Sequence, residues 1–501
     1  MASSPQPAKK SYFFGKGYRD VGKTIAGAWQ RNWDSILDFK DNIGVAKDTC
    51  GTKVFICKLI LNVLAIVSVV VFGSILTAVV SLLNILIVAL MMFFVYLGFS
   101  IIWLADRIYL TRKKIFTACH ECKEKSLIPT YICPKCDAEH TNLTPGVYGI
   151  LHRTCTGKVP GAYCGEVLPT TFFNGRRNLK AICPHCRTPL SDRESVPICI
   201  PVVGGRSVGK TAFITAFSKD FIEKIAPAQS WETEFYNSKK EEIYNQIEQD
   251  YNSGDTRMTE RPQDINKASS VSFSFFVKGA PFTPERLVHV YDIAGEVFTD
   301  STENEMQKQY EYCQGIVLMI DPFAIPSVRS RCEDQLTSVD IAGIGKADIG
   351  GIVDSFLNKL REVTGLSDNK MASVPLAVVI GKIDSANLSQ EIGEPAVKEK
   401  MASDPMRFKD FYDTQDYLCR RFLRENGMES FLNNVELKFK DNRFFACSAI
   451  GHTRSTGQYM PQGVMAPMQW LFGKADSKMA KAWDDYKINP KLVKIDDNVA
   501  V

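Results

Sequence analysis

One stretch of the chain has the residue types and spacing of a phosphate-binding loop. The apolar residues 196–203 are followed by GGRSVGKT and then by a helix-like apolar periodicity over residues 212–221. The pattern GxxxxGK[ST] between a strand and a helix lets backbone N–H groups curl around phosphates. We expect Lys210 to reach the β- and γ-phosphates of a nucleotide, and the Thr211 hydroxyl to ligate Mg²⁺. The predicted nucleotide-binding residues of this loop are Gly204, Gly205, Arg206, Ser207, Val208, Gly209, Lys210 and Thr211.

The same pattern occurs a second time, at residues 17–24. No buried strand of adequate length precedes this second copy, and no partner motif follows in its own domain. We therefore interpret it as a chance match, because the motif needs its strand and helix to work.

A second motif of the predicted nucleotide site follows a strand that is expected over residues 287–291. The sequence DIAG comes directly after this strand. Asp292 is predicted to hold the Mg²⁺ shell, and the Gly295 N–H to touch the γ-phosphate. Glu296 comes next, and it is either a group that orients water or an exposed residue of a switch segment. The predicted catalytic set is Lys210, Thr211, Asp292, Gly295 and Glu296.

The base-binding residues are predicted at the ends of two later strands. Residues 376–380 lead into GKID, where Asp384 could accept hydrogen bonds from guanine N1–H and N2–H₂ while the Lys382 stem covers the base. Residues 443–447 lead into Ser448 and Ala449, which are placed to line the base with backbone. A threonine that closes over the phosphates is predicted in the polar stretch 252–264, with Thr259 favoured over Thr256.

The order of these motifs resembles that of translation-factor and Ras-related GTPases, and the wording of residues 291–298 and 463–471 resembles the bacterial double-GTPase-type branch of that clade. The resemblance covers about residues 195–474. It implies an α/β, Ras-like fold with a mostly parallel six-stranded sheet, helices on both faces, and Mg²⁺-dependent GTP hydrolysis that drives switching. It also implies protein partners, often in conflict or defence systems. Gly381 departs from the family, which has Asn or Thr there. Arg206 is either an arginine finger or a solvated loop residue.

Eight of the 15 cysteines lie between Cys119 and Cys186, and six of them form three CxxC pairs. This density indicates structural zinc in a reducing compartment, with redox-active CxxC as a weaker alternative because no thioredoxin-like context surrounds the pairs. The spacing predicts two Cys₄ sites in sequence order, with His140, His152 and His185 as substitutes or loop residues. The predicted sets are Cys119, Cys122, Cys133 and Cys136, then Cys155, Cys164, Cys183 and Cys186.

No charged side chain occurs between Lys58 and Asp106, a run of 47 residues. One straight helix of that length would measure roughly 70 Å against a hydrocarbon core of about 30 Å. We therefore predict two membrane spans, at residues 54–76 and 82–104, with both basic flanks in the cytoplasm. A hairpin that dips in and returns without crossing is the alternative. Residues 1–52 form either an interfacial helix on lipid or a solvated one.

Composition limits the function classes. The net charge of +4 over 501 residues is too weak to indicate nucleic-acid binding, and the cysteine block lacks a basic stripe. We expect a GTPase switch that binds GTP, Mg²⁺ and two Zn²⁺, anchored at the inner (cytoplasmic) membrane and facing the cytoplasm, with a protein effector or activator. The alternatives are a nucleotide-sensing scaffold or zinc-ribbon module without turnover, and an ATPase of the same class. The predicted domains are a basic segment 1–52, a transmembrane hairpin 53–106, a double zinc ribbon 107–193, a GTPase 194–475 and a tail 476–501.

Overall fold

The computed structural model describes residues 6–119, 121–122, 124–191, 194–252, 271–293, 312–336, 344, 351, 371–451, 459–483 and 495. The chain divides into two compact units, each discontinuous in sequence. The first contains Met1–Arg112 and Ile128–Ile182, and the second contains Lys113–Leu127 and Cys183–Val501. The segment predicted as one double zinc ribbon is thus shared between the two units.

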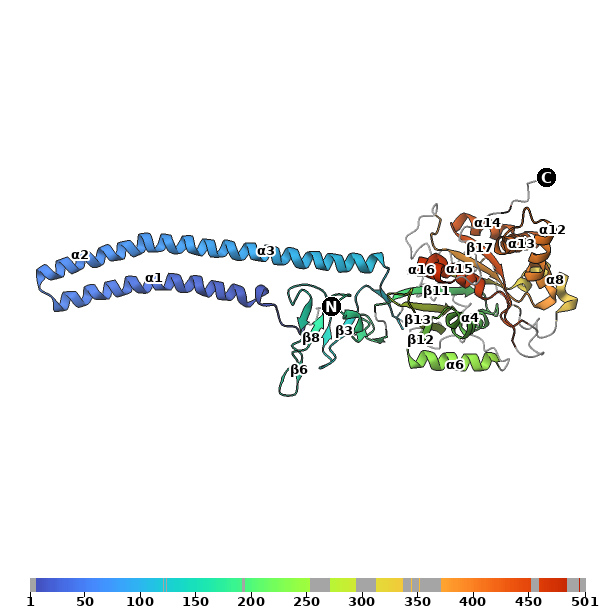
Figure 1. Cartoon of the computed structure of the whole chain (residues 1–501), viewed down its shortest axis with the longest axis horizontal. Coiled ribbons are helices and arrows are strands. Elements are labelled where there is room, and N and C mark those ends of the chain that lie inside the picture. Colours follow the sequence, from blue (N-terminus) through green and yellow to red (C-terminus); the bar gives the residue numbers. More distant parts are fainter. Residues whose placement is uncertain are drawn as a thin grey trace. The chain divides into compact units, whose positions relative to one another are not determined.

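The second unit is built on a seven-stranded sheet in the order β12-β13-β14-β11-β15-β16-β17 (Figure 1). The strands are β11 (Val196–Gly204), β12 (Glu232–Phe235), β13 (Val271–Lys278), β14 (Arg286–Asp292), β15 (Ile316–Ile320), β16 (Leu376–Ile380) and β17 (Asn442–Ala446). The last five in the spatial order are mutually parallel, and β12 and β13 pair antiparallel at one edge. The sheet is therefore mostly parallel, as predicted, but it has one strand more than the six that were expected, because β12 extends the antiparallel edge.

Helices cover both faces of this sheet. Along β11 the side chains alternate, so that Ile198 and Val202 belong to one core and Cys199 and Val203 to the other. The first core is completed by α4 (Lys210–Asp220), α6 (Ser238–Asn252), α15 (Met465–Ala475) and α16 (Ser477–Ala482). The second is completed by α8 (Pro326–Cys332), α11 (Ser389–Ile392), α12 (Glu394–Ser403), α13 (Phe411–Glu425) and α14 (Glu429–Lys438). Strands buried on both faces explain why the strand sequences are near-continuous apolar runs.

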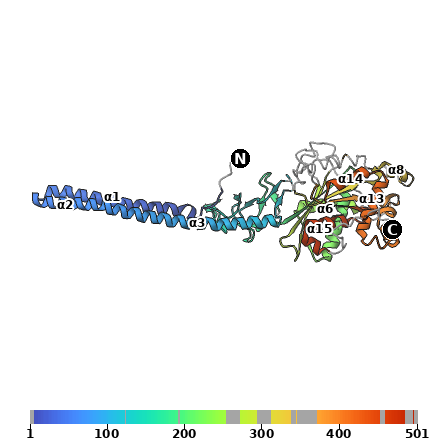
Figure 2. The same ribbon diagram turned by 90° about the horizontal axis from the view of Figure 1, so that it is seen from above.

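The first unit begins with two antiparallel helical arms. Helix α1 (Lys16–Thr49) returns alongside α2 (Thr52–Ser68) and α3 (Ser74–Arg112), as Figures 1 and 2 both show. A π-helical turn, Val69–Gly73, joins α2 to α3, so that Thr52–Arg112 is one uninterrupted helix of 61 residues. By length and composition it could cross a membrane.

The prediction of two spans separated by a turn within residues 73–84 is wrong. The chain reverses direction between α1 and α2, at Cys50 and Gly51, and residues 73–84 are helical. The segment has no proline, and one glycine in an apolar helix weakens it without ending it. The π turn also has a partner on α1, because the Asn32 side chain donates to the Gly73 carbonyl at 3.2 Å and to the Thr77 hydroxyl at 2.7 Å.

The rest of the first unit is a set of short strands that pack against the end of α3. Strand β3 (Thr130–Ile132) pairs with β4 (Glu139–His140) and β9 (Ala181–Ile182), β5 (His152–Thr154) with β8 (Val167–Pro169), and β6 (Lys158–Val159) with β7 (Ala162–Tyr163). A buried ion pair joins these strands to the helix, with Arg176 Nη1 lying 3.0 Å from Asp106 Oδ2. Sheets this short bury little apolar surface and need a further source of stability.

Candidate nucleotide-binding site and zinc centres

The loop between β11 and α4 has the backbone of a phosphate-binding loop. Gly209 has a φ of 93° and Ser207 one of 62°, both in the left-handed region, and Gly204 has a φ of 156°. A Cβ at Gly204 would come within 2.7 Å of the Met319 carbonyl oxygen on β15, which excludes any other residue there. Glycine is therefore required at position 209 by the backbone of the turn and at position 204 by the close approach of β15.

Lys210 is folded into this loop. Its ammonium donates to the Gly204 carbonyl at 3.1 Å and to the Gly205 carbonyl at 2.8 Å, and the residue is 5% exposed. These bonds hold the positive charge inside the loop, where phosphate oxygens would bind beside the N-terminus of α4. Arg206, in contrast, is exposed.

The predicted Mg²⁺ ligands lie together. The Thr211 hydroxyl, at the start of α4, donates to Asp292 Oδ2 at 2.6 Å. Asp292 ends β14 and is fully buried, and β14 lies directly beside β11 with Asp292 in register with Val202. A hydroxyl and a carboxylate next to the phosphate loop are the oxygen donors that Mg²⁺ prefers, so these residues fit the ion.

The predicted base-binding residues also meet, at the ends of β16 and β17. The Ser448 hydroxyl donates to Asp384 Oδ1, and it accepts from the Gly451 N–H at 2.8 Å. The carbonyl of Ala449 accepts from the Tyr251 hydroxyl of α6. Residues 448–451, after β17, are thus fixed next to Asp384. Since the carboxyl ends of parallel strands share one edge, this pair lies on the same edge of the sheet as Lys210 and Asp292.

One residue of this edge escaped the sequence reasoning as a site residue. Asp321 follows β15, is fully buried, and receives an ion pair from the Lys382 ammonium at 2.6 Å. It also accepts from the Phe323 N–H at 3.0 Å. Lys382 itself has a φ of 54°. The signal was present in the sequence, because Asp321 follows an apolar strand just as Asp292 does.

Gly381 departs from the pattern of similar GTPases without a steric reason. A Cβ at this position would lie 3.5 Å from the Val208 carbonyl oxygen and 3.6 Å from Met319 Cε, which are ordinary contacts. The position therefore has room for a Cβ, which would lie beside the phosphate loop at Val208.

Some predicted residues lie outside the described residues, namely Thr256, Thr259, Gly295 and Glu296. The second copy of the loop pattern is described, and residues 17–24 belong to α1. A helical segment cannot form a phosphate loop, so its rejection is confirmed.

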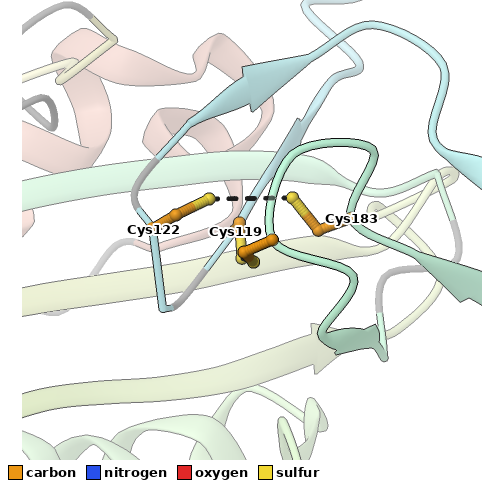
Figure 3. A group of neighbouring side chains, drawn as sticks. Cys119, Cys122 and Cys183 are labelled. Atoms are coloured by element: carbon orange, nitrogen blue, oxygen red, sulfur yellow. Dashed lines mark hydrogen bonds between the residues drawn. The ribbon is translucent and has the colours of Figure 1, made fainter. Parts of the chain in front are cut away.

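The eight predicted zinc-binding cysteines form two clusters. In the second unit, Cys119, Cys122, Cys183 and Cys186 come together (Figure 3), and in the first unit Cys133, Cys136, Cys155 and Cys164 do. Sulfur pairs in the former lie 3.4 and 3.7 Å apart, and in the latter 3.6 and 3.5 Å. Four sulfurs at about 2.3 Å from a tetrahedral zinc ion would be spaced by about 3.8 Å, so both clusters fit the metal.

The predicted division of these cysteines was wrong. The two CxxC pairs nearest in sequence do not share a site. The first pair, Cys119 and Cys122, combines with the third pair, Cys183 and Cys186. Residues 128–182, which lie between these two pairs in sequence, belong to the first unit. Each CxxC turn supplies two sulfurs, but strand pairing decides which turns meet, and spacing alone cannot show that. The cluster of Cys119, Cys122, Cys183 and Cys186, called the first cluster below, belongs to the core of the second unit. Phe116 and Ala118, just before Cys119, are part of the hydrophobic core beneath β15.

Neighbouring groups pack against the cluster of Cys133, Cys136, Cys155 and Cys164, called the second cluster below. His140 is fully buried, and its Nε2 lies 3.3 Å from Cys155 Sγ, so it is a neighbour of a ligand and not a member of the four. The Gly157 N–H points to the same sulfur at 3.3 Å. A Cβ at Gly157 would lie 2.4 Å from Cys136 Sγ, which requires glycine there. Burial lowers the pKa of His140 to about 4, so the ring is neutral at physiological pH.

The first cluster has thiols of unequal acidity. Burial raises the pKa of the Cys122 thiol to about 11. At Cys186 burial acts in the same direction, but hydrogen bonds with Thr188, Cys119 and Cys122 together outweigh it and lower the pKa to about 6. Zinc must therefore displace protons at Cys122, while Cys186 is readily a thiolate.

The fold and these sites define a P-loop GTPase-like domain. Residues 198–417 match the family described as Double-GTPase 2. No curated protein matches the chain.

Three solved structures are similar to parts of the chain at low identity. The chain is similar to the GTP-bound Ski7 GTPase-like domain of S. cerevisiae, at 11% identity and a TM-score of 0.25 over 57% of this chain and 50% of that one. It is similar to the Arl6 small GTPase of Trypanosoma brucei, at 12% identity and a TM-score of 0.23, over 56% of this chain and 99% of that one. It is also similar to a bacterial selenocysteine-specific elongation factor, at 12% identity and a TM-score of 0.23, over 58% of this chain and 29% of that one. The chain spans half the length of the Ski7 chain that it matches. The likeness to GTPases rests on the family match and on the motifs at the strand ends.

Proposed function

We propose that this protein is a membrane-associated, Mg²⁺-dependent GTPase that acts as a nucleotide-controlled switch for a protein partner. The observation that supports this most is the alignment of two residue pairs on one edge of the sheet. Thr211 and Asp292 adjoin the phosphate loop beside β11 and β14, and Asp384 and Ser448 follow β16 and β17, which lie beyond β15 in the sheet. This is the separation of a phosphate-and-metal end from a base end.

Each group has a role that follows from its chemistry. Lys210 neutralises charge that develops on the transferred phosphoryl group. Thr211 and Asp292 would hold Mg²⁺, which would supply positive charge against the phosphates when bound. Asp384 gives base selectivity, because a carboxylate accepts from the N1–H and N2–H₂ of guanine, whereas adenine lacks both donors. Catalysis is then positioning and charge neutralisation, with no covalent intermediate on the protein.

The switch would be held at a membrane. The helix Thr52–Arg112 is long and apolar enough to associate with one, and we place the GTPase unit on the cytoplasmic face of the inner membrane. A partner that binds the GTP state, in a bacterial conflict or defence system, follows from the resemblance of the motifs to that branch of GTPases. The two zinc ions would have a structural role, because each cluster already supplies four sulfur ligands.

Phosphate release tests the enzymatic part. The full chain in detergent should release phosphate from GTP with Mg²⁺ and not with EDTA, and Lys210→Ala should abolish release. An exposed lysine of the same unit offers a matched control, since Lys409→Ala removes an equal charge from the segment that precedes α13. GTP turnover that persists in Lys210→Ala, or turnover of ATP alone, would contradict the proposal.

A further inference from the structure

Helix α1 has two chemically distinct faces. A stripe with heptad-like spacing is buried or half-buried against α2 and α3, and it comprises Tyr18, Val21, Ile25, Ala28, Asn32, Ile36, Phe39, Ile43 and Ala46. All eleven charged residues of α1 are exposed. At 3.6 residues per turn they gather on the face away from this stripe. Trp29 and Trp33 are exposed along one side of it.

The helix formed by α2 and α3 has no such polar face. It exposes large apolar side chains along its whole length, such as Leu61, Phe72, Leu82 and Phe94. No charged residue occurs between Lys58 and Asp106. Its 61 residues measure roughly 90 Å, three times the hydrocarbon core of a bilayer.

Helix α1 accompanies this apolar helix over most of its length. At one end Phe14 packs on Tyr96 with ring centroids 5.0 Å apart, and in the middle Asn32 bonds to Thr77. At the other end the two arms meet at Cys50. A bilayer crossed by the hairpin at any level would therefore enclose a charged part of α1, such as Arg31 with Asp34 and Asp38.

A crossing would also move charge to the far side. The tip of the hairpin carries Lys47, Asp48, Lys53 and Lys58, and all four are exposed. Transferring such a basic tip through the hydrocarbon opposes the normal distribution of positive charge.

We propose that the hairpin lies in the plane of the membrane and occupies one leaflet, with α2–α3 among the acyl chains and the charged face of α1 at the headgroups. The inference rests on the membrane association proposed above, and it replaces the transmembrane orientation with an interfacial one. Exposed Trp29 and Trp33 then lie at the depth that tryptophan favours. A second copy of the chain is a poorer occupant of the same surface, because a coiled-coil seam is one stripe flanked by charge, whereas α2–α3 is apolar on every exposed face.

Three cysteine positions distinguish the orientations. The full chain is reconstituted into phosphatidylcholine–phosphatidylglycerol vesicles, and the population whose GTPase unit trypsin reaches from outside is assayed. A charged, membrane-impermeant maleimide is added outside or trapped inside, and labelled peptides are identified by mass spectrometry. The probes are native Cys50 at the tip, Gln30→Cys on the charged face of α1, and Leu82→Cys in the middle of the helix Thr52–Arg112.

The in-plane anchor predicts that Cys50 and Gln30→Cys react completely with outside reagent, and that Leu82→Cys reacts with neither reagent until detergent is added. Reaction of Leu82→Cys with trapped reagent would show two spans, and reaction of Cys50 with trapped reagent alone would show that the hairpin crosses; either result overturns the inference. Flotation of the full chain with the same vesicles separates this failure from that of membrane association itself. A chain that hydrolyses GTP but does not float overturns both membrane statements and leaves the GTPase proposal standing.

Discussion

Replacing Arg176 by Met should strongly destabilise the first unit while leaving nucleotide binding intact. Arg176 is fully buried, and its Nη1 contacts Asp106 Oδ2 at 3.0 Å, the Leu143 carbonyl at 3.2 Å and the Thr170 carbonyl at 2.8 Å. The variant keeps the apolar volume but leaves a buried carboxylate whose remaining hydrogen-bond donor, among the residues that the structure describes, is the Phe172 N–H at 2.9 Å. Breaking a buried ion pair by removing one partner costs about 3–5 kcal/mol.

The double variant Asp106→Leu with Arg176→Met sharpens the test. It removes both charges, so the remaining cost is that of two carbonyls without their donor and of the Phe172 N–H without its acceptor, about 1–3 kcal/mol each when buried. The double variant should therefore be less destabilised than the sum of its single variants, by several kcal/mol. A smaller effect of about 1 kcal/mol or less is expected for the control Arg177→Met, because Arg177 is half-exposed and only stacks on Phe172.

The stability of the first unit is measured by unfolding the chain with urea in detergent and monitoring the release of zinc from the second cluster. The integrity of the second unit is measured by the binding of a fluorescent GTP analogue. The prediction is an earlier zinc release in Arg176→Met with unchanged nucleotide affinity. An unchanged release midpoint, or strict additivity in the double variant, would refute the assignment of a buried, charge-coupled link between α3 and the short strands.

Three further changes test the sites. Asp321→Asn should weaken GTP binding about tenfold, because a charge-assisted bond to Lys382 contributes about 1.5–3 kcal/mol; equal affinity would mean that Asp321 does not position that lysine. Gly381→Asn should tighten GTP binding several-fold, since one new hydrogen bond to the Val208 carbonyl contributes about 0.5–1.5 kcal/mol, and a loss of affinity would argue against the free space there. Cys119→Ser should lower the zinc content from two ions to one and make Cys183 reactive to maleimide while Cys133 stays protected; the reverse pattern would restore the sequence-order division. In the unmodified chain, a chelator should remove zinc from this first cluster more readily as the pH falls. The Cys122 thiol has a pKa of about 11, so protons compete with zinc for its sulfur. A release of zinc that does not depend on pH would contradict this.

The nucleotide site was largely predictable, because its chemistry is local to strand ends. Lys210, Thr211, Asp292, Asp384 and Ser448 each follow an apolar run, and a parallel sheet places such positions on one edge whatever the loops between them do. The strand β12 was missed since its sequence, ETEF, alternates weakly and gains its structure from pairing with β13.

The zinc centres and the helical arms were predicted in content but not in connection. The cysteines of the two sites alternate along the chain, and only the pairing of distant turns reveals which of them meet. In the arms, the charge-free run was read as two helices because one span is limited to about 30 Å. Length does not force a turn if the helix need not cross, and α1 supplies the polar cover that the run itself lacks.

The central claim is that Lys210 and Asp384 mark the two ends of a guanine nucleotide site, and equilibrium binding tests it most directly. Fluorescent GTP and ATP analogues should be titrated against the full chain with Mg²⁺, against Lys210→Ala and against Asp384→Asn. We predict binding of GTP and not of ATP, loss of GTP binding in both variants, and recovery of affinity in Asp384→Asn for xanthosine triphosphate, whose O2 accepts from the amide. ATP binding that equals GTP binding and is indifferent to Asp384→Asn would contradict the account.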